Sequence, residues 1–228
     1  NNLRAYVPLQ LLYLTLKYGN SKFSPLIFTL YGFFICIAFG DYQKGQKFGQ
    51  LGLRLLEKSN DNDLICKTHF IYARLINHWR NHVKEGLNSY DIAYKSGIEA
   101  GNLLFAAYAA IYLVITRLIL GDHLDQVLKE EKKYNGFIRR IQYEDCLPFF
   151  TLTRQMIHAL KGQTKHDTCL DDDHFDETGY INQIRNENEI PFAMAWYYII
   201  KTQTLFLFEE YQGALKTAQK TEERLESG

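Results

Sequence analysis

Apolar side chains recur every three or four residues along most of this chain, with polar positions between them. Leu64, Ile71, Leu75 and Trp79, for example, fall on one face of a helix with 3.6 residues per turn. The same periodicity, broken at intervals by glycine or by polar pairs, predicts a chain made of helices. The expected helices cover residues 3–18, 25–39, 42–58, 64–79, 83–100, 103–120, 124–141, 143–160, 175–186, 192–208 and 211–225.

The breaks between these helices recur at a regular spacing. Gly40-Asp41, Asn81-His82, Gly121-Asp122 and Lys161-Gly162 stand about 40 residues apart, and Glu209-Glu210 follows after a longer gap. Such a period is typical of an array of helix hairpins, in which each hairpin buries its apolar face against the next one. We therefore expect an all-α protein, a right-handed superhelix of about five stacked antiparallel helix hairpins.

We expect residues 1–228 to form a single helical repeat domain. The polar stretch 162–176 has no helical period and predicts a loop. The chain begins at Asn1 without Met and stops at Gly228, directly after a helical pattern. We therefore expect a segment of a longer polypeptide.

Several residues are suited to begin or end the expected helices. Gly19 follows the first helix and favours a C-terminal cap there. Ser24 is expected to cap the second helix, with Pro25 at its first helical position. Asp61 or Asn62 is expected to cap the helix that follows the polar linker.

Gly45, Gly49 and Gly52 lie along one stripe of the helix expected at residues 42–58. Glycine inside a helix costs roughly 1 kcal/mol relative to alanine. Three glycines on one stripe therefore predict that a neighbouring helix approaches closely at this position.

Composition agrees with long helices and excludes some partners. The chain has 16 tyrosines and 15 phenylalanines but only four prolines, which suits long helices packed through aromatic rings. Lysine plus arginine and aspartate plus glutamate each number 26. Because the net charge is zero, neither nucleic acid nor an anionic membrane surface is an expected partner.

The apolar run at 26–39 is the one stretch that resembles a membrane span. It is shorter than the roughly 20 residues that a span requires, and Asp41 and Lys44 follow it closely. We therefore expect a buried helix and no membrane insertion. The cysteines lie far apart and mostly in apolar runs, which indicates reduced, buried thiols in a cytoplasmic protein. They are Cys36, Cys66, Cys146 and Cys169.

The acidic segment before the helix at 175–186 holds the best candidate metal ligands. Its residues have side chains that suit zinc or calcium. A calcium loop would need glycine at the sixth position from Asp171, where Asp176 stands, and a zinc site would need a second cysteine near Cys169. We expect a solvated loop and no metal. The candidates are His166, Asp167, Cys169, Asp171, Asp172, Asp173, His174 and Asp176.

No other pattern predicts catalysis or a cofactor. The segment 40–47 has the glycine spacing of a phosphate-binding loop, but Gln46 stands where the lysine is required, and a helix rather than a strand precedes it. We expect a helix-hairpin turn there. His69, His78 and His82 are expected to be satisfied or surface histidines. The aromatic residues Tyr108, Tyr112, Trp196, Tyr197 and Tyr198 are expected to pack between helices.

The order of several short motifs resembles the helical region of large predicted ATPases of the AAA or STAND type. The resemblance spans nearly the whole chain and includes the spacing of Tyr211, Ala214 and Ala218, which is similar to that of the second helix of a tetratricopeptide hairpin. The motifs are Tyr18-Gly19, Tyr31-Gly32, Gly40-Asp41-Tyr42, Gly45, Phe48-Gly49, Leu51, Leu53, Leu55-Leu56-Glu57, Gly97-Ile98-Glu99-Ala100-Gly101-Asn102, Phe105-Ala106-Ala107-Tyr108-Ala109, Phe175-Asp176-Glu177 and Leu207-Phe208-Glu209-Glu210-Tyr211-Gln212-Gly213-Ala214.

This resemblance implies a tetratricopeptide-like superhelix beside a nucleotide-binding module, in polypeptides that often carry serine/threonine-kinase, GAF and histidine-kinase domains. It implies a non-catalytic regulatory or protein-interaction module of a signalling protein, whose partner is a protein or a neighbouring domain. Two alternatives remain open. One is a free-standing tetratricopeptide-type adaptor that docks a peptide. The other is an enzyme that uses a metal at residues 166–176.

Overall fold

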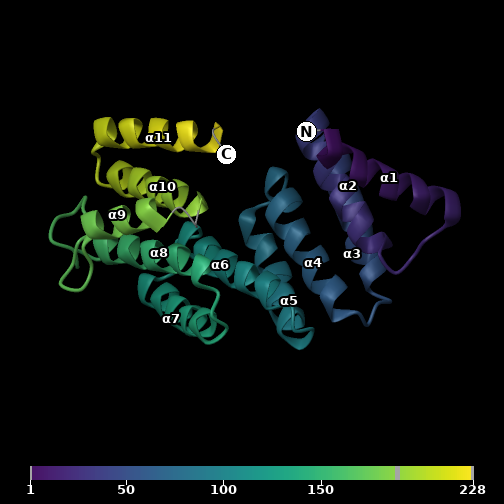
Figure 1. The fold of residues 1–228 in the computed structure, drawn as a ribbon, viewed down its shortest axis with the longest axis horizontal. Coiled ribbons are helices and arrows are strands. Elements are labelled where there is room, and N and C mark those ends of the chain that lie inside the picture. Colours follow the sequence, from purple (N-terminus) through teal and green to yellow (C-terminus); the bar gives the residue numbers. More distant parts are fainter. Residues whose placement is uncertain (1, 188–190, 227–228) are drawn as a thin grey trace. The chain divides into compact units, whose positions relative to one another are not determined.

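The computed structural model describes residues 2–187 and 191–226. These residues form eleven α-helices joined by turns and short π and 3₁₀ segments (Figure 1). No described residue lies in a β-strand, and the prediction of an all-α protein is therefore confirmed. The chain divides into two compact units, Asn1–Leu120 and Gly121–Gly228. The superhelical arrangement and the single domain stay predictions.

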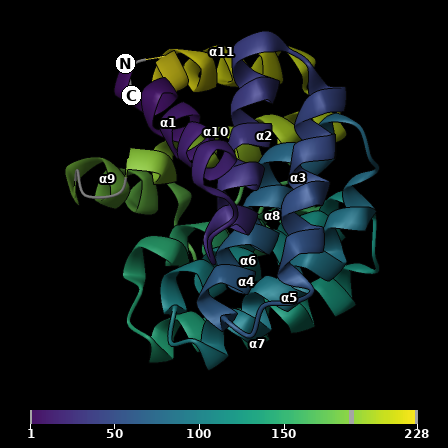
Figure 2. The ribbon, with the colours of Figure 1, turned by 90° about the vertical axis from the view of Figure 1, so that its right-hand side faces the viewer.

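The first unit stacks its helices against neighbours in chain order. α1 packs on α2, α2 lies along α3, α4 packs on α5, and α5 packs on α6 (Figures 1 and 2). A π segment and two 3₁₀ segments connect α4 to α5. The bounds are α1 (Asn2–Tyr18), α2 (Ser24–Phe39), α3 (Tyr42–Leu56), α4 (Asn62–Ile71), η1 (Tyr72–Ile76), η2 (Asn77–Trp79), η3 (Val83–Glu85), α5 (Gly86–Glu99) and α6 (Leu103–Ile119).

Most predicted helices lie within two or three residues of the observed ones, but the start of α2 is a correction. Ser24 is the first residue of α2 rather than its cap, and its hydroxyl accepts a hydrogen bond from the N–H of Ser21 at 2.8 Å. Pro25 lies in the first turn, where a missing N–H costs nothing. Of the two residues predicted to cap α4, Asp61 does so and Asn62 is the first helical residue, because the carboxylate of Asp61 accepts from the N–H of Leu64 at 3.2 Å.

The helix predicted at 64–79 is also corrected. The α-helix ends at Ile71, widens into the π segment η1, and tightens into the 3₁₀ segment η2. A change of winding rotates the residues that follow it relative to a continuous α-helix. Trp79, which the 3.6-residue period placed on the buried face, is 44% exposed.

The close approach predicted from the glycine row is confirmed, and the neighbouring helix is α2. A methyl group added at Gly52 would lie 2.5 Å from the carbonyl oxygen of Pro25 and would also collide with Thr29. One added at Gly32 of α2 would lie 2.5 Å from the carbonyl oxygen of Gly45. Pro25, at the start of α2, meets Gly52 near the end of α3, while Gly32 further along α2 meets Gly45 near the start of α3. The two helices are therefore antiparallel.

An aromatic cluster fills the space between α4, α5 and α6. The ring of Phe70 lies 5.6 Å from Phe105, 5.9 Å from Tyr108 and 5.8 Å from Tyr112. Tyr90 stacks on Tyr112 with 5.6 Å between ring centroids. The prediction that Tyr108 and Tyr112 pack between helices is confirmed.

The second unit is built around α8 and α10. α7 and α10 both pack on α8, while α9 and α11 pack on α10, and both views show α11 next to α10 (Figures 1 and 2). No helix lies between Leu160 and Glu177, the region of the expected loop. The bounds are α7 (Leu124–Arg140), η4 (Glu144–Cys146), α8 (Leu147–Leu160), α9 (Glu177–Glu187), α10 (Pro191–Leu207) and α11 (Tyr211–Glu226).

Thiols and apolar helices follow the sequence expectations with one exception. All four cysteines are free, and Cys36, Cys66 and Cys146 are buried, but Cys169 is only half-buried in the loop after α8. Burial raises the pKa of the Cys66 thiol to about 12 and that of Cys146 to about 11. Among the described residues, no helix has the length and apolar character needed to cross a membrane.

Candidate functional site

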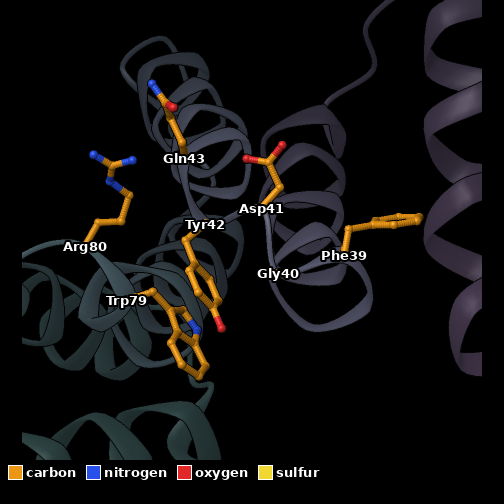
Figure 3. A pocket seen from close by; sticks show the side chains of 7 residues that line it. All are labelled: Phe39, Gly40, Asp41, Tyr42, Gln43, Trp79 and Arg80. Atoms are coloured by element: carbon orange, nitrogen blue, oxygen red, sulfur yellow. The ribbon is translucent and has the colours of Figure 1, made fainter.

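A shallow hollow of about 730 Å³ opens on the first unit where the α2–α3 turn meets η2. Figure 3 shows two stacked rings, those of Tyr42 and Trp79, on one side and the polar ends of other side chains extending away from them. The ring of Phe39 points away from the rest. The lining residues are Phe39, Gly40, Asp41, Tyr42, Gln43, Trp79 and Arg80.

The turn that forms one side of the hollow is fixed by its own sequence. Gly40 ends α2 in the left-handed conformation, with φ of 64°, and its N–H donates to the carbonyl of Cys36. A residue with a side chain would be strained in this conformation. Asp41 caps α3 by accepting from the N–H of Lys44 at 3.0 Å, and its second oxygen pairs with the Lys44 ammonium at 2.9 Å. The turn therefore presents Tyr42 and Gln43 from the first turn of α3.

This geometry explains why segment 40–47 is no phosphate loop. The carboxylate of Asp41 already accepts a hydrogen bond from the first turn of α3, at the helix end where a phosphate would bind. That hydrogen bond, with the ion pair to Lys44, lowers the pKa of Asp41 and keeps its negative charge in place. The segment is the helix-hairpin turn that the sequence predicts.

A chain of amides holds the other side of the hollow against α3. Gln46 donates to the side-chain oxygen of Asn81 at 2.9 Å, and Asn81 donates to that of Asn77 at 2.8 Å. Asn77 is buried. Because these hydrogen bonds join the segment after η1 to the start of α3, they fix the position of Trp79 and Arg80 between Asn77 and Asn81.

The two aromatic rings form a preformed apolar platform. Tyr42 and Trp79 stack with 4.6 Å between centroids and 9° between planes, and they remain 37% and 44% exposed. The indole N–H of Trp79 donates to the carbonyl of Leu75 at 3.1 Å, which fixes the ring. Exposed aromatic residues of low conformational freedom are typical of protein-binding surfaces.

Polar groups with unused hydrogen-bonding capacity border this platform. Within the described chain, the guanidinium of Arg80 and the amide of Gln43 have no hydrogen-bond or ion-pair partner. Arg80 is exposed, and its five donors suit a carboxylate. Asp41, the one acidic residue of the lining, is already paired with Lys44. The hollow can therefore bind an apolar group beside an anion, and it contains no nucleophile or acid–base pair.

A second polar cluster lies in the second unit and anchors the loop after α8. Asp172 accepts hydrogen bonds from Gln155 at 3.0 Å and from the N–H of His174 at 2.7 Å, and its other contact is with His158 at 3.1 Å. Burial opposes the ionisation of Asp172, but these hydrogen bonds outweigh it and lower its pKa to about 2. Asp172 is thus a charged anchor between the loop and α8.

Glu177 anchors the other end of the same loop. Its carboxylate accepts from the N–H of Leu170 at 3.0 Å, from the hydroxyl of Tyr197 at 2.8 Å and from the ammonium of Lys201 at 2.7 Å. The charged ends of Glu177 and Lys201 are largely buried. Lys201 also donates to the carbonyl of Thr168. The loop is therefore tied to α8 on one side and to α10 on the other.

Several of the candidate metal ligands predicted from the sequence instead form hydrogen bonds within this loop. Asp171 accepts from the N–H of Glu177, Asp176 accepts from that of Thr178, and Cys169 contacts the backbone of His166. Across residues 2–187 and 191–226, no three histidine, cysteine or acidic side chains are placed to hold a metal ion.

The three histidines in the stretch from α4 to the start of α5 contact different neighbours. The ring of His69 lies 3.3 Å from the hydroxyl of Ser89, His78 packs on Trp79, and His82 accepts from the N–H of Lys84. Burial lowers the pKa of His69 to about 4. These roles agree with satisfied or surface histidines.

Sequence reasoning missed the buried polar residues of the second unit. Glu131 of α7 is buried, accepts from Asn135 at 2.9 Å and lies 3.5 Å from Arg154, and burial raises its pKa. A signal was available, because Glu131 lies four residues after Val127 and three before Tyr134, on the inward stripe of the helix. Gln155 and Glu177 had no such signal, since their partners are distant in sequence.

Comparison with known proteins shows that part of the chain is similar in sequence to a signalling protein. No known protein-family model matches it, and no solved structure matches it. Over 150 residues, which is 65% of this chain, it is 29% identical to hybrid signal transduction histidine kinase G of Dictyostelium discoideum. That match spans 4% of the kinase's length. The chain is therefore similar to a small part of a much longer signalling protein.

Proposed function

We propose that this chain is a non-catalytic interaction module of a cytoplasmic signal-transduction protein. In this proposal it is the tetratricopeptide-like region of a polypeptide of the ATPase and kinase type, and it binds a partner protein or a neighbouring domain. The observation that carries the proposal is the similarity to a segment of a hybrid histidine kinase. It agrees with the family resemblance of the motifs from Tyr18-Gly19 to Gly213-Ala214.

The chemistry of the described residues supports a binding role. The thiols of Cys66 and Cys146 are buried and held protonated by their raised pKa values, so they are poor nucleophiles. His158 and Asp172 form the kind of pair that could orient a catalytic base, yet no described serine, threonine or cysteine is hydrogen-bonded to His158. Both residues instead fix the loop after α8.

The proposed mechanism is a shift between two arrangements of the neighbouring modules. A partner that binds one arrangement more tightly than the other stabilises it by the difference in binding free energy. Coupling of this kind typically changes an equilibrium by about 5- to 150-fold. Stacked helices are suited to this role because each one contacts mainly its neighbours, so that the array can bend without losing its core.

The test compares the native gene product with a version from which residues 1–228 are deleted, using phosphate incorporation from labelled ATP as the readout. The deletion is expected to change the rate at least about fivefold. The purified chain alone is expected to show neither ATP hydrolysis nor phosphate incorporation. Turnover by the chain alone, or an unchanged rate after deletion, contradicts the proposal.

A free-standing peptide-docking adaptor is the second candidate function. The hollow beside Tyr42 and Trp79 favours it, since the preformed rings need no partner domain to order them. The coding sequence on either side of this chain, read from the transcript, distinguishes the two functions. Coding sequence for kinase or nucleotide-binding domains on either side would support the signalling module, and its absence would support the adaptor.

A further inference from the structure

We propose that the hollow between the α2–α3 turn and η2 binds an extended acidic segment of a partner protein, with an apolar or aromatic side chain next to an aspartate or glutamate. This proposal rests on the proposed function, for which it names the docking site and the chemistry of the partner. The apolar side chain lies against the Tyr42–Trp79 platform, and the carboxylate pairs with Arg80.

The charges around the hollow select an acidic partner. Asp41 is neutralised by Lys44 at 2.9 Å, whereas Arg80 has no acidic partner among the described residues. Lys47 follows Gln43 by four residues, so it lies on the same face of α3. It is exposed, and its charge helps to lower the pKa of Asp41 without forming a direct ion pair. The uncompensated charge at this end of α3 is therefore positive, which attracts a negative segment and repels a basic one.

The shape of the hollow favours an extended segment over a compact domain. It is shallow and open, and the ring pair lies on one side while the ends of Arg80 and Gln43 extend away on the other (Figure 3). An extended chain can place successive residues along these two parts. The amide of Gln43 is available to a backbone carbonyl or N–H between them.

The platform is rigid before the partner arrives, which reduces the entropy lost on binding. The indole of Trp79 is fixed by its hydrogen bond to Leu75, and the segment that carries Arg80 is fixed by Asn81 and Gln46. Tryptophan and arginine are also the residue types most often found to dominate binding energy at protein interfaces.

The test uses fluorescent blocked peptides of about eight residues, each with one aromatic residue flanked by aspartate or glutamate, and a matched set with asparagine and glutamine instead. Anisotropy is expected to show acidic peptides binding at micromolar affinity. Trp79→Ala and Arg80→Gln should each weaken binding about tenfold. Lys129→Gln, which removes one exposed charge from α7 in the other unit, should leave the affinity unchanged.

Fluorescence of the protein itself locates the bound peptide. The chain has two tryptophans, so a Trp196→Phe variant leaves Trp79 as the sole indole. Saturating peptide is expected to change its emission, with the same midpoint as the anisotropy. Circular dichroism of both site variants should match that of the parent, since Trp79 and Arg80 are exposed.

The proposal is overturned if no acidic peptide binds, if neutral peptides bind equally well, or if Arg80→Gln behaves like Lys129→Gln. These outcomes are distinct from failure of the proposed function. If phosphate incorporation by the native protein depends on residues 1–228 but is unaffected by Arg80→Gln, the proposed function is supported and this docking site is contradicted. If peptides bind at the hollow but the deletion has no effect, the docking site is supported and the proposed function is contradicted.

Discussion

In the first unit, α2 and α3 touch along glycines, and the gap between their backbones is too small for a methyl group at Gly32 or Gly52. In the second unit, the segment between α8 and α9 is held by the carboxylates of Asp172 and Glu177, which accept hydrogen bonds from side chains and backbone of three different elements. The first unit brings two helices together by omitting side chains. The second unit ties a loop to two helices through charged side chains, of which Glu177 and Lys201 are largely buried.

The two solutions have different sensitivities. Glycine-mediated contact depends on shape, so a single added carbon atom disrupts it and a change of pH does not. A buried ion pair tolerates small changes of shape, but it loses much of its energy when one partner is removed, because the other charge is then buried without compensation. Urea unfolding of single-tryptophan variants can separate the two cases, since Trp79 reports on the first unit and Trp196 on the second.

Removal of the Glu177 carboxylate is expected to have the largest effect. Glu177→Ala leaves the Lys201 ammonium, the Tyr197 hydroxyl and the N–H of Leu170 without their partner. We expect a loss of about 3 to 5 kcal/mol from the free energy of unfolding of the second unit, measured by Trp196 fluorescence in a Trp79→Phe background.

The matched control for this prediction is the exposed ion pair of Lys161 with Asp125 in the same unit, where the side chain of Asp125 is 61% exposed. Asp125→Ala should cost less than about 1 kcal/mol. Equal effects of the two variants would mean that burial of Glu177 does not strengthen its ion pair, and the contrast between the units would fail.

Addition of one methyl group to the glycine contact is expected to have the next largest effect. In Gly52→Ala the new carbon would lie 2.5 Å from the carbonyl of Pro25, so α2 and α3 must separate. We expect a loss of about 2 kcal/mol in the first unit, the cost of overpacking less the gain in helix propensity. The measurement is Trp79 fluorescence in urea, in a Trp196→Phe background.

Gly136 of α7 provides the control for this prediction, because a methyl group there meets nothing within 4 Å. Gly136→Ala should stabilise the second unit by about 0.5 to 1 kcal/mol. If Gly52→Ala were stabilising as well, the glycines of α3 would not mark a close contact.

The part of this architecture that local sequence determines could be predicted. Gly40 and Asp61 form their hydrogen bonds with residues no more than four positions away, so the turn and the cap could be predicted from local sequence. The row of Gly45, Gly49 and Gly52 was informative because glycine is unfavourable in a helix unless space requires it. The number and order of helices followed from the apolar period.

The candidate site depended on contacts that no local pattern encodes. The apolar period continues through Tyr72 and Ile76, but in the fold both side chains meet Gly49, and the helix winds differently there. The exposure of Trp79 and its stacking on Tyr42 follow from that change. Glu177 likewise contacts Lys201 of α10, which lies 24 residues further along the chain, so no local pattern links the two.

The third prediction has the smallest expected effect and concerns the dependence of the first unit's stability on pH. His69 is a titratable side chain within the packing of this unit. Burial lowers the pKa of His69 from 6.5 to about 4. Between these values the unfolded chain binds a proton that the folded chain does not, so stability falls as the pH falls from 6.5 to 4. The full shift corresponds to at most about 3 kcal/mol, and because the ring is partly exposed we expect a loss of about 1 kcal/mol between pH 6.5 and 4.5.

The measurement is the urea midpoint of the Trp196→Phe variant at several pH values, with and without His69→Gln. The glutamine variant keeps a polar group near Ser89 but cannot take up a proton, so its stability should decline less than that of the parent from pH 6.5 to 4.5. The decline that remains is expected from His78, whose pKa is lowered by burial and by Arg74. Equal slopes would show that His69 is solvated in the folded chain. The His69 ring would then add no pH dependence to the first unit, and the contrast with the charged anchors of the second unit would be sharper.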